Sequence, residues 1–311
     1  MTSPKVAAIL CVRNSSTRLP NKPLVSYHPN GKSNLECIID RVLTSRHNPR
    51  IVVATSNDRS DDTIANYITT RHTQIGSSGN DGSSVFLYRG ELDNVVARFD
   101  GALKKFVPDA EFIWRVMGDC PLLDVGLNDW RTDVLQRTGA DSILVNSPEP
   151  TYAAMGSVWS RAAWDYCAKN SSGSMLEHPG ELIWERMSEF RILHDPGPES
   201  VYYQNIRTEL DTEEDLEFFR QVWKEHYWDA DFETRDSALL ETKDVLTWLS
   251  SQPNIVAINS GVKEKTHSVY LHGHHRARRF VCKECGTAIG HRVNDKLSLT
   301  CPGCGEIRDY Y

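Results

Sequence analysis

The chain has 311 residues, of which 40% are hydrophobic and 25% charged, and its formal net charge is −7. These values are typical of a globular protein and exclude a disordered or collagen-like chain. No run of about 18 apolar residues occurs, so the sequence predicts no membrane-spanning helix. Because the N-terminal residues also lack the basic and long apolar regions of a signal peptide, we expect a cytoplasmic protein.

The first predicted element is a strand over residues 6–12 (VAAILCV), a continuous apolar run typical of a strand buried on both faces. A polar, basic loop follows. Apolar positions at helical spacing then predict a helix over residues 35–43, with Asn34 as its N-cap. A second strand over residues 51–54 completes a βαβ unit.

The same alternation continues through the first half of the chain. We expect a helix over residues 61–70, a loop over 75–84 and a strand over 85–88. A helix capped by Asp93 should then run to residue 106, followed by a strand over 112–117. Alternating strands and helices predict an α/β layered fold with a mostly parallel sheet.

Further elements are expected in the second half. Residues 141–145 are predicted to form a strand, and residues 157–168 a strand followed by a helix. An amphipathic helix is predicted over residues 213–226, acidic at its start and basic near its end. A shorter helix is expected near residues 245–249.

The C-terminal part differs from the rest in charge. Residues 263–311 contain 9 Lys and Arg against 5 Asp and Glu, whereas the remainder contains 26 against 37. The two parts are therefore expected to have different roles. The C-terminal part is only mildly basic, so its charge alone does not predict nucleic-acid binding.

The eight cysteines fall into two groups. Four are scattered singly, as small buried thiols usually are: Cys11, Cys37, Cys120 and Cys167. The others form two C-x2-C pairs separated by 15 residues: Cys282, Cys285, Cys301 and Cys304. This spacing predicts a tetrahedral, structural Zn²⁺ site in a small zinc ribbon, with a redox pair as the alternative.

The loop after the first strand, residues 13–24, contains three cations: Arg13, Arg18 and Lys22. Cations and small hydroxyl side chains after a buried strand suit a polyphosphate, although such a loop also fits a solvated surface turn. It is neither a Walker loop nor a G-x-G-x-x-G loop. Ligands of parallel sheets bind beyond the carboxyl ends of the strands, so this loop and Asp119 are expected to face one site.

The pattern R-x4-R-L-P-x-K-P-L that begins at Arg13 resembles the signature of cytidylyltransferases that make CMP-activated sugar acids. Further segments resemble the spore-coat-polysaccharide (SpsF-like) branch of that family and occur in its order: 51–62, 90–99, 117–124 and 210–216. Glu177 and His178, ahead of a helix, also resemble that branch. The resemblance covers roughly residues 6–225 and is most specific in the loop and in the Gly-Asp-Cys-Pro segment at 118–121.

The resemblance implies a Rossmann-like nucleotidyltransferase of the glycosyltransferase-A type. Such an enzyme transfers CMP from CTP to a hydroxyl of a sugar acid or related acceptor and releases pyrophosphate. It also implies that Asp119 and Asp211 bind Mg²⁺, a hard cation that prefers carboxylate oxygen. The alternative for Asp211 is an N-cap of the following helix, and the alternative for Asp119 is a cap of the turn before Pro121.

The resemblance assigns the remaining site residues to two substrates. The nucleotide would be bound by Arg13, Ser15, Ser16, Arg18 and Lys22. Three of these, Arg13, Arg18 and Lys22, would also stabilise charge on the α-phosphorus and on pyrophosphate. The acceptor would be bound by Glu177 and His178, although a Glu-His pair is also a common surface feature.

The sequence departs from the family pattern in four places. Asn21 replaces a usual glycine, Met117 replaces a common threonine, and residues 152–155 lack an acidic pattern seen in many relatives, which leaves the acceptor open. The zinc ribbon is an addition. It could dock a protein, a nucleic acid or a second copy of the chain in a homodimer, while the basic run over 272–279 that leads into it also fits a solvated linker.

These observations predict three regions. Residues 1–235 would form the cytidylyltransferase-like catalytic domain, residues 236–275 a linker with a helix, and residues 276–311 the zinc ribbon. Two other functions stay open. One is a nucleotide-sugar glycosyltransferase of the same fold, which usually needs a D-x-D motif where this chain has Asp119-Cys120-Pro121. The other is a nucleic-acid- or protein-binding module that works through the ribbon.

Overall fold

The computed structural model describes most of the first 262 residues and four short strands beyond them. The described ranges are 4–14, 16–29, 31–75, 85–145, 156–195, 206–227, 241–262, 278–281, 288–292, 297–300 and 307–310. No helix in these ranges is long and apolar enough to cross a membrane.

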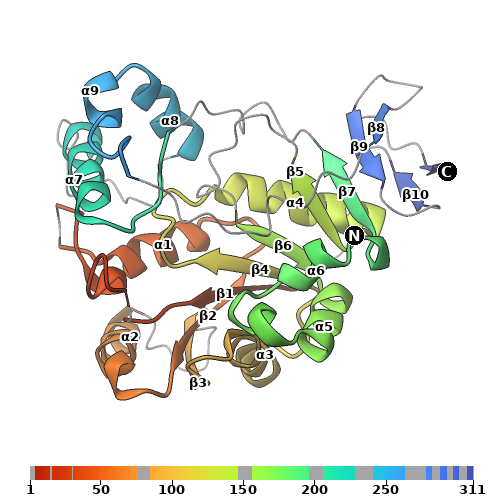
Figure 1. Cartoon of the computed structure of the whole chain (residues 1–311), viewed down its shortest axis with the longest axis horizontal. Helices are drawn as coiled ribbons and strands as arrows, with labels where there is room; N and C mark the ends of the chain where they lie inside the picture. The colour runs from red at the N-terminus through yellow and green to blue at the C-terminus, as the bar shows by residue number, and fades with distance from the viewer. Residues whose placement is uncertain are drawn as a thin grey trace.

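A seven-stranded sheet forms the centre of the molecule, in the order β3-β2-β1-β4-β6-β5-β7 (Figure 1). Its strands are β1 (Val6–Cys11), β2 (Arg50–Ser56), β3 (Val85–Gly90), β4 (Phe112–Met117), β5 (Ser142–Val145), β6 (Ser157–Ser160) and β7 (Ile192–Asp195). Within this sheet β6 runs antiparallel to both β4 and β5, and the other pairs are parallel. The predicted α/β fold with a mostly parallel sheet is therefore confirmed.

Helices cover both faces of the sheet. On one face lie α1 (Asn34–Leu43), α2 (Asp62–Ile75) and α4 (Val125–Thr138), and on the other α3 (Val95–Phe106), α5 (Arg161–Asn170) and α6 (Glu181–Glu185). Three further helices pack away from the sheet: α7 (Glu213–Tyr227), α8 (Thr242–Ser250) and α9 (Pro253–Val256). Four 3₁₀ turns lie within the described ranges: Lys22–Leu24, Arg59–Asp61, Gly173–Glu177 and Met187–Glu189. The elements predicted near 35–43, 61–70, 157–168, 213–226 and 245–249 are confirmed.

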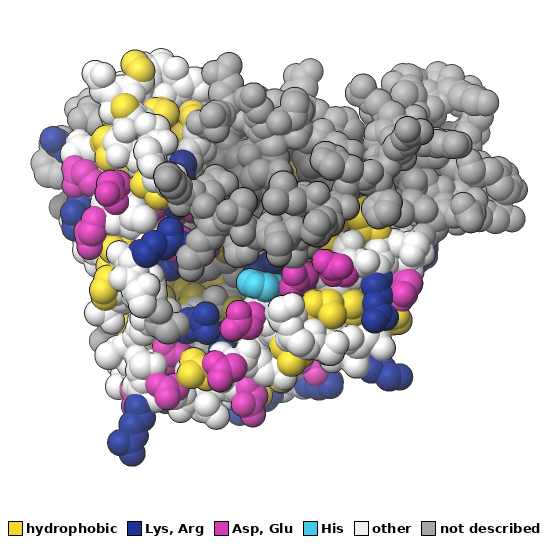
Figure 2. Space-filling model, in the orientation of Figure 1, with side chains coloured by type: hydrophobic (Ala, Val, Ile, Leu, Met, Phe, Trp, Pro, Cys, Tyr) yellow, Lys and Arg dark blue, Asp and Glu magenta, His cyan; other side chains and the backbone are white. Residues whose placement is uncertain are grey.

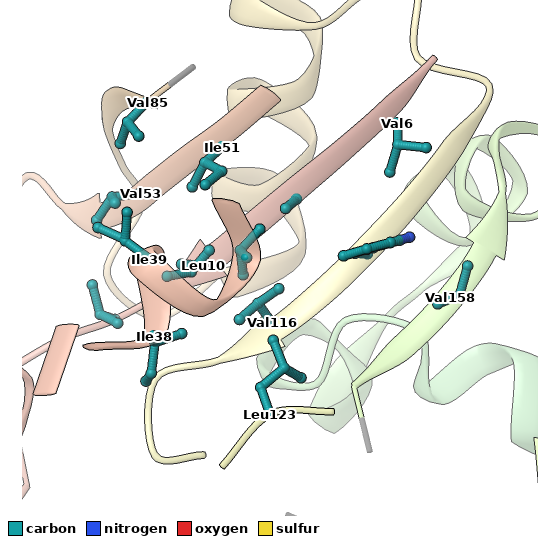
Figure 3. Close-up of a cluster of buried hydrophobic side chains, with 14 of the residues drawn as sticks. Val6, Leu10, Ile38, Ile39, Ile51, Val53, Val85, Val116, Leu123 and Val158 are labelled. Atoms are coloured by element: carbon teal, nitrogen blue, oxygen red, sulfur yellow. The ribbon is translucent and has the colours of Figure 1, made fainter. Parts of the chain in front are cut away.

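Two hydrophobic clusters hold these layers together. In one, side chains of β1, β2 and β4 pack against α1, α2 and α4, as Figure 3 shows for Leu10, Ile38 and Val116. In the other, the opposite sides of the same strands pack against α3, α5 and α6, with Phe99 and Trp164 among the buried side chains. Helices cover both faces of the sheet, so the side chains on both faces of the central strands are buried. This is why these strands appear in the sequence as continuous apolar runs.

Two predicted helix caps are wrong by one residue. The N-cap of α1 is Ser33, not Asn34, because Ser33 Oγ accepts a hydrogen bond from Glu36 N at 3.2 Å and Glu36 Oε2 accepts one from Ser33 N at 2.9 Å. This reciprocal capping box satisfies two backbone donors. Similarly, α3 is capped by Asn94, whose Oδ1 accepts a hydrogen bond from Ala97 N at 2.8 Å, and not by Asp93.

Helix α4 has no counterpart among the elements predicted from the sequence. Its inward side includes several polar residues, Asn128, Asp129, Arg131 and Thr132, all buried. These side chains have partners in neighbouring elements: Ser45 Oγ donates to Asp129 Oδ1 at 2.5 Å, and Trp114 Nε1 donates to Thr132 Oγ1 at 2.9 Å. A helix with a polar buried side has little apolar periodicity to detect.

A third cluster brings the segment 241–262 onto the rest of the fold. Leu246 and Leu249 of α8 pack with Phe219 of α7 and with Leu19, which lies in the loop after β1. Part of the region expected to be a linker therefore packs against the predicted phosphate loop. On the face shown in Figure 2, acidic and basic side chains are interspersed and hydrophobic ones form small groups.

The C-terminal strands form two antiparallel pairs. β8 (Arg278–Val281) pairs with β9 (Ala288–Arg292), and β10 (Leu297–Thr300) pairs with β11 (Ile307–Tyr310). The β8–β9 pair lies at the β7 end of the sheet (Figure 1). The four zinc-binding residues predicted from the sequence, Cys282, Cys285, Cys301 and Cys304, lie outside the described residues.

Candidate active site

A cavity of about 320 Å³ opens where β1 and β4 end. Six charged residues among those predicted for the site line it: Arg13, Arg18, Lys22, Asp119, Glu177 and Asp211. Ser16 lines it as well, whereas Ser15 lies outside the described residues. Cations and carboxylates from segments far apart in the sequence therefore meet in one pocket at the carboxyl edge of the parallel strands, where ligands of such sheets bind.

Lys22 lies between the two predicted metal ligands. Its Nζ is 3.1 Å from Asp119 Oδ2 and 2.9 Å from Asp211 Oδ1, and all three side chains are partly shielded from solvent. Arg18 Nη2 forms a further ion pair with Asp211 Oδ2. The carboxylates thus hold cationic groups between and beside them, so this part of the pocket suits a cation.

The loop after β1 is tied to the β2–α2 turn. Asn14 N donates to Asp61 Oδ1 at 2.7 Å, and Asn14 Nδ2 donates to Ser60 O at 2.9 Å. Asp61 is fully buried and also accepts hydrogen bonds from the backbone and hydroxyl of Ser56. The start of the loop therefore has a fixed path out of the sheet.

Asn21, which replaces the usual glycine of the loop, has a left-handed backbone with φ of 54°. Glycine adopts this conformation freely, and asparagine tolerates it better than other residues. The Asn21 carbonyl accepts hydrogen bonds from Leu24 N at 2.7 Å and Val25 N at 3.2 Å, which closes the turn that carries Lys22. The substitution therefore preserves the shape of the loop.

The loop of Asp119 is held from two sides. Asn34 Nδ2 donates to Gly118 O at 2.7 Å, and Leu210 N donates to Asp119 O at 2.9 Å. Gly118 is required here, because a Cβ at this position would lie 2.5 Å from Val12 Cγ1. The backbone contact through Leu210 joins the Asp119 loop directly to the segment that carries Asp211.

Asp211 is positioned by a buried carboxylate that the sequence analysis missed. Asp215 is fully buried, and its Oδ2 accepts hydrogen bonds from Asp211 N at 2.9 Å and Thr212 N at 3.0 Å. Arg207 Nε and Asn259 Nδ2 donate to its Oδ1 at 2.8 and 3.0 Å. The spacing of Thr212 and Asp215 resembles a capping box, which could have indicated this role.

The two alternatives for the metal ligands can be judged from these contacts. The Asp211 side chain pairs with Arg18 and Lys22 and makes no capping hydrogen bond to α7 among the described residues. The Asp119 carboxylate likewise points to Lys22, and it contacts the thiol of Cys120 at 3.7 Å. Burial raises the pKa of Cys120 well above its usual value, so the thiol stays protonated.

The two residues expected to bind the acceptor are separated. Glu177 ends the 3₁₀ turn Gly173–Glu177 and lines the cavity, whereas His178, the next residue, is half-buried and is not part of the lining. The cavity also includes two residues that the sequence analysis did not select, Arg98 of α3 and Arg115 of β4. They lie inside regular elements, so no loop motif indicated them.

Comparison with known proteins gives a family for the first part of the chain. Residues 7–129 match the cytidylyltransferase family. This range includes the loop after β1 and Asp119 but ends before Asp211. It favours nucleotidyl transfer over the glycosyltransferase alternative.

Two curated relatives were compared with the chain. An uncharacterized protein of Methanocaldococcus jannaschii is 25% identical over 270 residues, which is 85% of this chain and 98% of that protein. A 3-deoxy-manno-octulosonate cytidylyltransferase of Cytophaga hutchinsonii is 28% identical over 118 residues, which is 38% of this chain and 41% of that enzyme.

Solved structures show the same fold. A cytidylyltransferase from Leptospira borgpetersenii superposes with a TM-score of 0.66 at 19% identity and covers 85% of this chain and all of that one. A nucleotidyl transferase from Methanothermobacter thermautotroptrophicus gives 0.51 at 13% identity, covering 71% of this chain and 99% of that one. The family match covers the basic loop and Asp119, so this part of the chain is similar to cytidylyltransferases, which is consistent with a nucleotidyltransferase.

Proposed function

We propose that this enzyme transfers CMP from CTP to a hydroxyl group of a sugar acid or related acceptor, with release of pyrophosphate, in a Mg²⁺-dependent reaction. The observation that carries the proposal is the position of Lys22 between Asp119 and Asp211 in a cavity that Arg13 and Arg18 also line. Carboxylates for a metal and cations for phosphates are thus available in one pocket. The similarity to a 3-deoxy-manno-octulosonate cytidylyltransferase supports the choice of nucleotide and acceptor class.

The residues present fit Mg²⁺. Asp119 and Asp211 already accommodate an ammonium group between them, and Mg²⁺ typically binds one or two carboxylates together with waters and substrate phosphates. These two aspartates would hold the ion. When bound, Mg²⁺ would neutralise charge on the phosphates and favour the deprotonated acceptor hydroxyl.

The chain's own cations would act on the triphosphate. Lys22 and Arg18 now pair with carboxylates, and exchange of those partners for phosphate oxygens would keep their charges compensated. Arg13 is exposed and makes no ion pair within the described parts of the chain. In the reaction the acceptor hydroxyl oxygen forms a bond to the α-phosphorus and its proton passes to solvent. The bond between the α-phosphorus and the oxygen that bridges to the β-phosphate breaks, and pyrophosphate leaves. Fixed cations stabilise the charge that develops on both sides.

The proposal is tested by measuring pyrophosphate release with CTP, UTP, ATP and GTP over a panel of sugar acids, with Mg²⁺ or with EDTA. We expect CTP-specific, EDTA-sensitive release and a CMP-linked product in the mass spectrum. Asp119→Asn should abolish release, whereas Asp165→Asn, an exposed carboxylate in a helical ion pair with Arg161, serves as the matched control. EDTA-insensitive turnover, or transfer from another nucleotide alone, would contradict the proposal.

We further propose that Cys282, Cys285, Cys301 and Cys304 bind one structural Zn²⁺. In the sequence one C-x2-C pair falls between the paired strands β8 and β9, and the other between β10 and β11. Two cysteine pairs, each between antiparallel strands, are the arrangement of a zinc ribbon. The ribbon would then serve to recruit a protein, a nucleic acid or a second copy of the chain.

A further inference from the structure

Two arginines line the cavity apart from the loop that would bind the triphosphate. Arg98 comes from α3, and Arg115 from β4, where it lies opposite Ile9 of β1. Both lie close enough to Cys11, at the end of β1, to act electrostatically on its thiol. The pocket therefore has a second cationic region, built on the sheet and on α3.

Arg98 is held by two backbone carbonyl groups, also forms a hydrogen bond with the Cys11 thiol, and keeps one N–H group without a partner among the described residues. Only 2% of the residue is exposed, and its Nη1 donates to the carbonyl oxygens of Glu91 at 2.7 Å and Leu92 at 3.1 Å. Its Nε is buried without a hydrogen-bond partner within the described ranges. A buried N–H that lacks a partner costs free energy, so this group is suited to a ligand atom.

Arg115 has no compensating carboxylate in the parts of the chain that the structure describes. It is half-buried, and none of the ion pairs or hydrogen bonds found among the described residues involves its guanidinium. Among the described residues Glu177 is the carboxylate that lines the cavity outside the Asp119–Asp211 pair, and no ion pair joins it to either arginine there. Two neighbouring guanidinium groups without an anion are costly in a partly desolvated pocket.

We propose that Arg98 and Arg115 form a subsite for the carboxylate of the acceptor, distinct from the cations that would bind the triphosphate. This inference rests on the proposed function. A planar guanidinium binds a carboxylate through two parallel hydrogen bonds, which makes the pair selective for acidic over neutral acceptors. A cytosine ring carries no charge, so two cations fit an anionic group better than they fit the base.

Cys11 provides a probe for this subsite because it is partly exposed beside both arginines. Iodoacetate carries a carboxylate, whereas iodoacetamide is a neutral molecule of nearly the same shape. Each reagent forms a bond from its carbon to the Cys11 sulfur and releases iodide, and the thiol proton passes to buffer. Rates at Cys11 are measured on the full chain at alkaline pH by peptide mass spectrometry.

We expect iodoacetate to modify Cys11 with saturation and at least about tenfold faster than iodoacetamide, the size of one charge-assisted hydrogen bond. Arg115→Gln should remove this preference, whereas Arg115→Lys, which keeps the positive charge, should retain part of it. Arg18→Gln, the same charge change on the triphosphate side, should leave the preference intact. Saturating Mg²⁺ and CTP should also leave it intact.

Three outcomes would overturn the inference. The wild type could show no preference for iodoacetate, or Arg18→Gln could remove the preference as fully as Arg115→Gln does. The preference could also disappear on addition of CTP, which would assign the arginines to the nucleotide. Steady-state kinetics give a second readout. Arg115→Gln should raise KM for a sugar-acid acceptor without changing KM for CTP or the preference for CTP over UTP. Labelling of Cys11 needs no turnover. If the expected labelling pattern is observed but no pyrophosphate is released, the result would contradict the proposed function and not the anion site.

Discussion

Lys22 Nζ lies 2.9 Å from Asp211 Oδ1, although 189 residues separate them in the sequence. The same ammonium group reaches Asp119 Oδ2 at 3.1 Å. A single cation therefore bridges the two carboxylates that would bind Mg²⁺. Binding of the metal requires Lys22 to change partners, and the phosphates of the nucleotide are the natural new ones. Metal and nucleotide binding are thereby expected to favour each other.

Asp119→Asn should abolish Mg²⁺-dependent turnover while the protein remains folded. The side chain is partly exposed on a loop and contributes no apolar packing, so its replacement by an isosteric amide leaves the core unchanged. Turnover and thermal unfolding are measured on the same preparation, with Asp165→Asn as control. Near wild-type turnover in a variant with a normal Tm would remove Asp119 from the mechanism.

Arg18→Ala should weaken CTP binding and slow the reaction, because the guanidinium meets charge that grows in the transition state. The expected loss of transition-state stabilisation is about 2 to 4 kcal/mol, the effect of removing one such donor. Steady-state kinetics and CTP titration measure it, and Arg46→Ala, which removes an exposed arginine paired with Asp133, is the control. Unchanged CTP affinity and rate would show that the loop is an ordinary surface turn.

Asn259→Ala should lower the affinity for Mg²⁺ even though Asn259 lies outside the cavity lining. Its amide donates to the buried carboxylate of Asp215, which accepts the backbone hydrogen bond of Asp211. Loss of one such buried partner costs about 1 to 3 kcal/mol. Titration of activity against Mg²⁺, together with urea unfolding, separates the positioning effect from a general loss of stability. Unfolding at lower urea with unchanged Mg²⁺ dependence would make Asn259 merely structural.

A chain ending at residue 262 should retain nucleotidyl transfer to a small acceptor, whereas one ending at residue 240 should not. The shorter chain lacks α8, and Leu246 and Leu249, which are fully buried against α7, would no longer cover the loop that carries Leu19. Activity and urea unfolding of the two truncations provide the comparison. An inactive but folded chain ending at 262 would place the C-terminal strands in the active site or at a required interface.

The protein should contain one Zn²⁺ per chain when it is purified without chelator. A unit of this size buries too little apolar surface to fold alone, and structural zinc supplies about 10 to 16 kcal/mol in comparable peptides. Cys301→Ser should therefore lose the metal and unfold the ribbon while transfer to a small acceptor persists. Elemental analysis that finds no zinc would refute this prediction.

Features encoded in short stretches of residues were accessible from the sequence. The apolar run at residues 6–12 predicted a buried strand because both of its faces are covered, and the order of residues after Arg13 indicated the resemblance to cytidylyltransferases that the match over residues 7–129 supports. The amphipathic pattern at 213–226 likewise predicted α7. Each of these signals depends on neighbouring positions in the chain, so no knowledge of the tertiary structure was needed.

Other features depend on which distant segments pack together, and the tertiary structure alone decided them. The polar buried side of α4 acquires partners only where Ser45 and Trp114 lie against it. Asn34, expected as a cap, instead supports the Asp119 loop. The neighbourhood of Arg98 and Arg115 follows from the packing of α3 on β1 and from the pairing of β1 with β4. Side chains with no local pattern become a site only when strand order and helix packing bring them together.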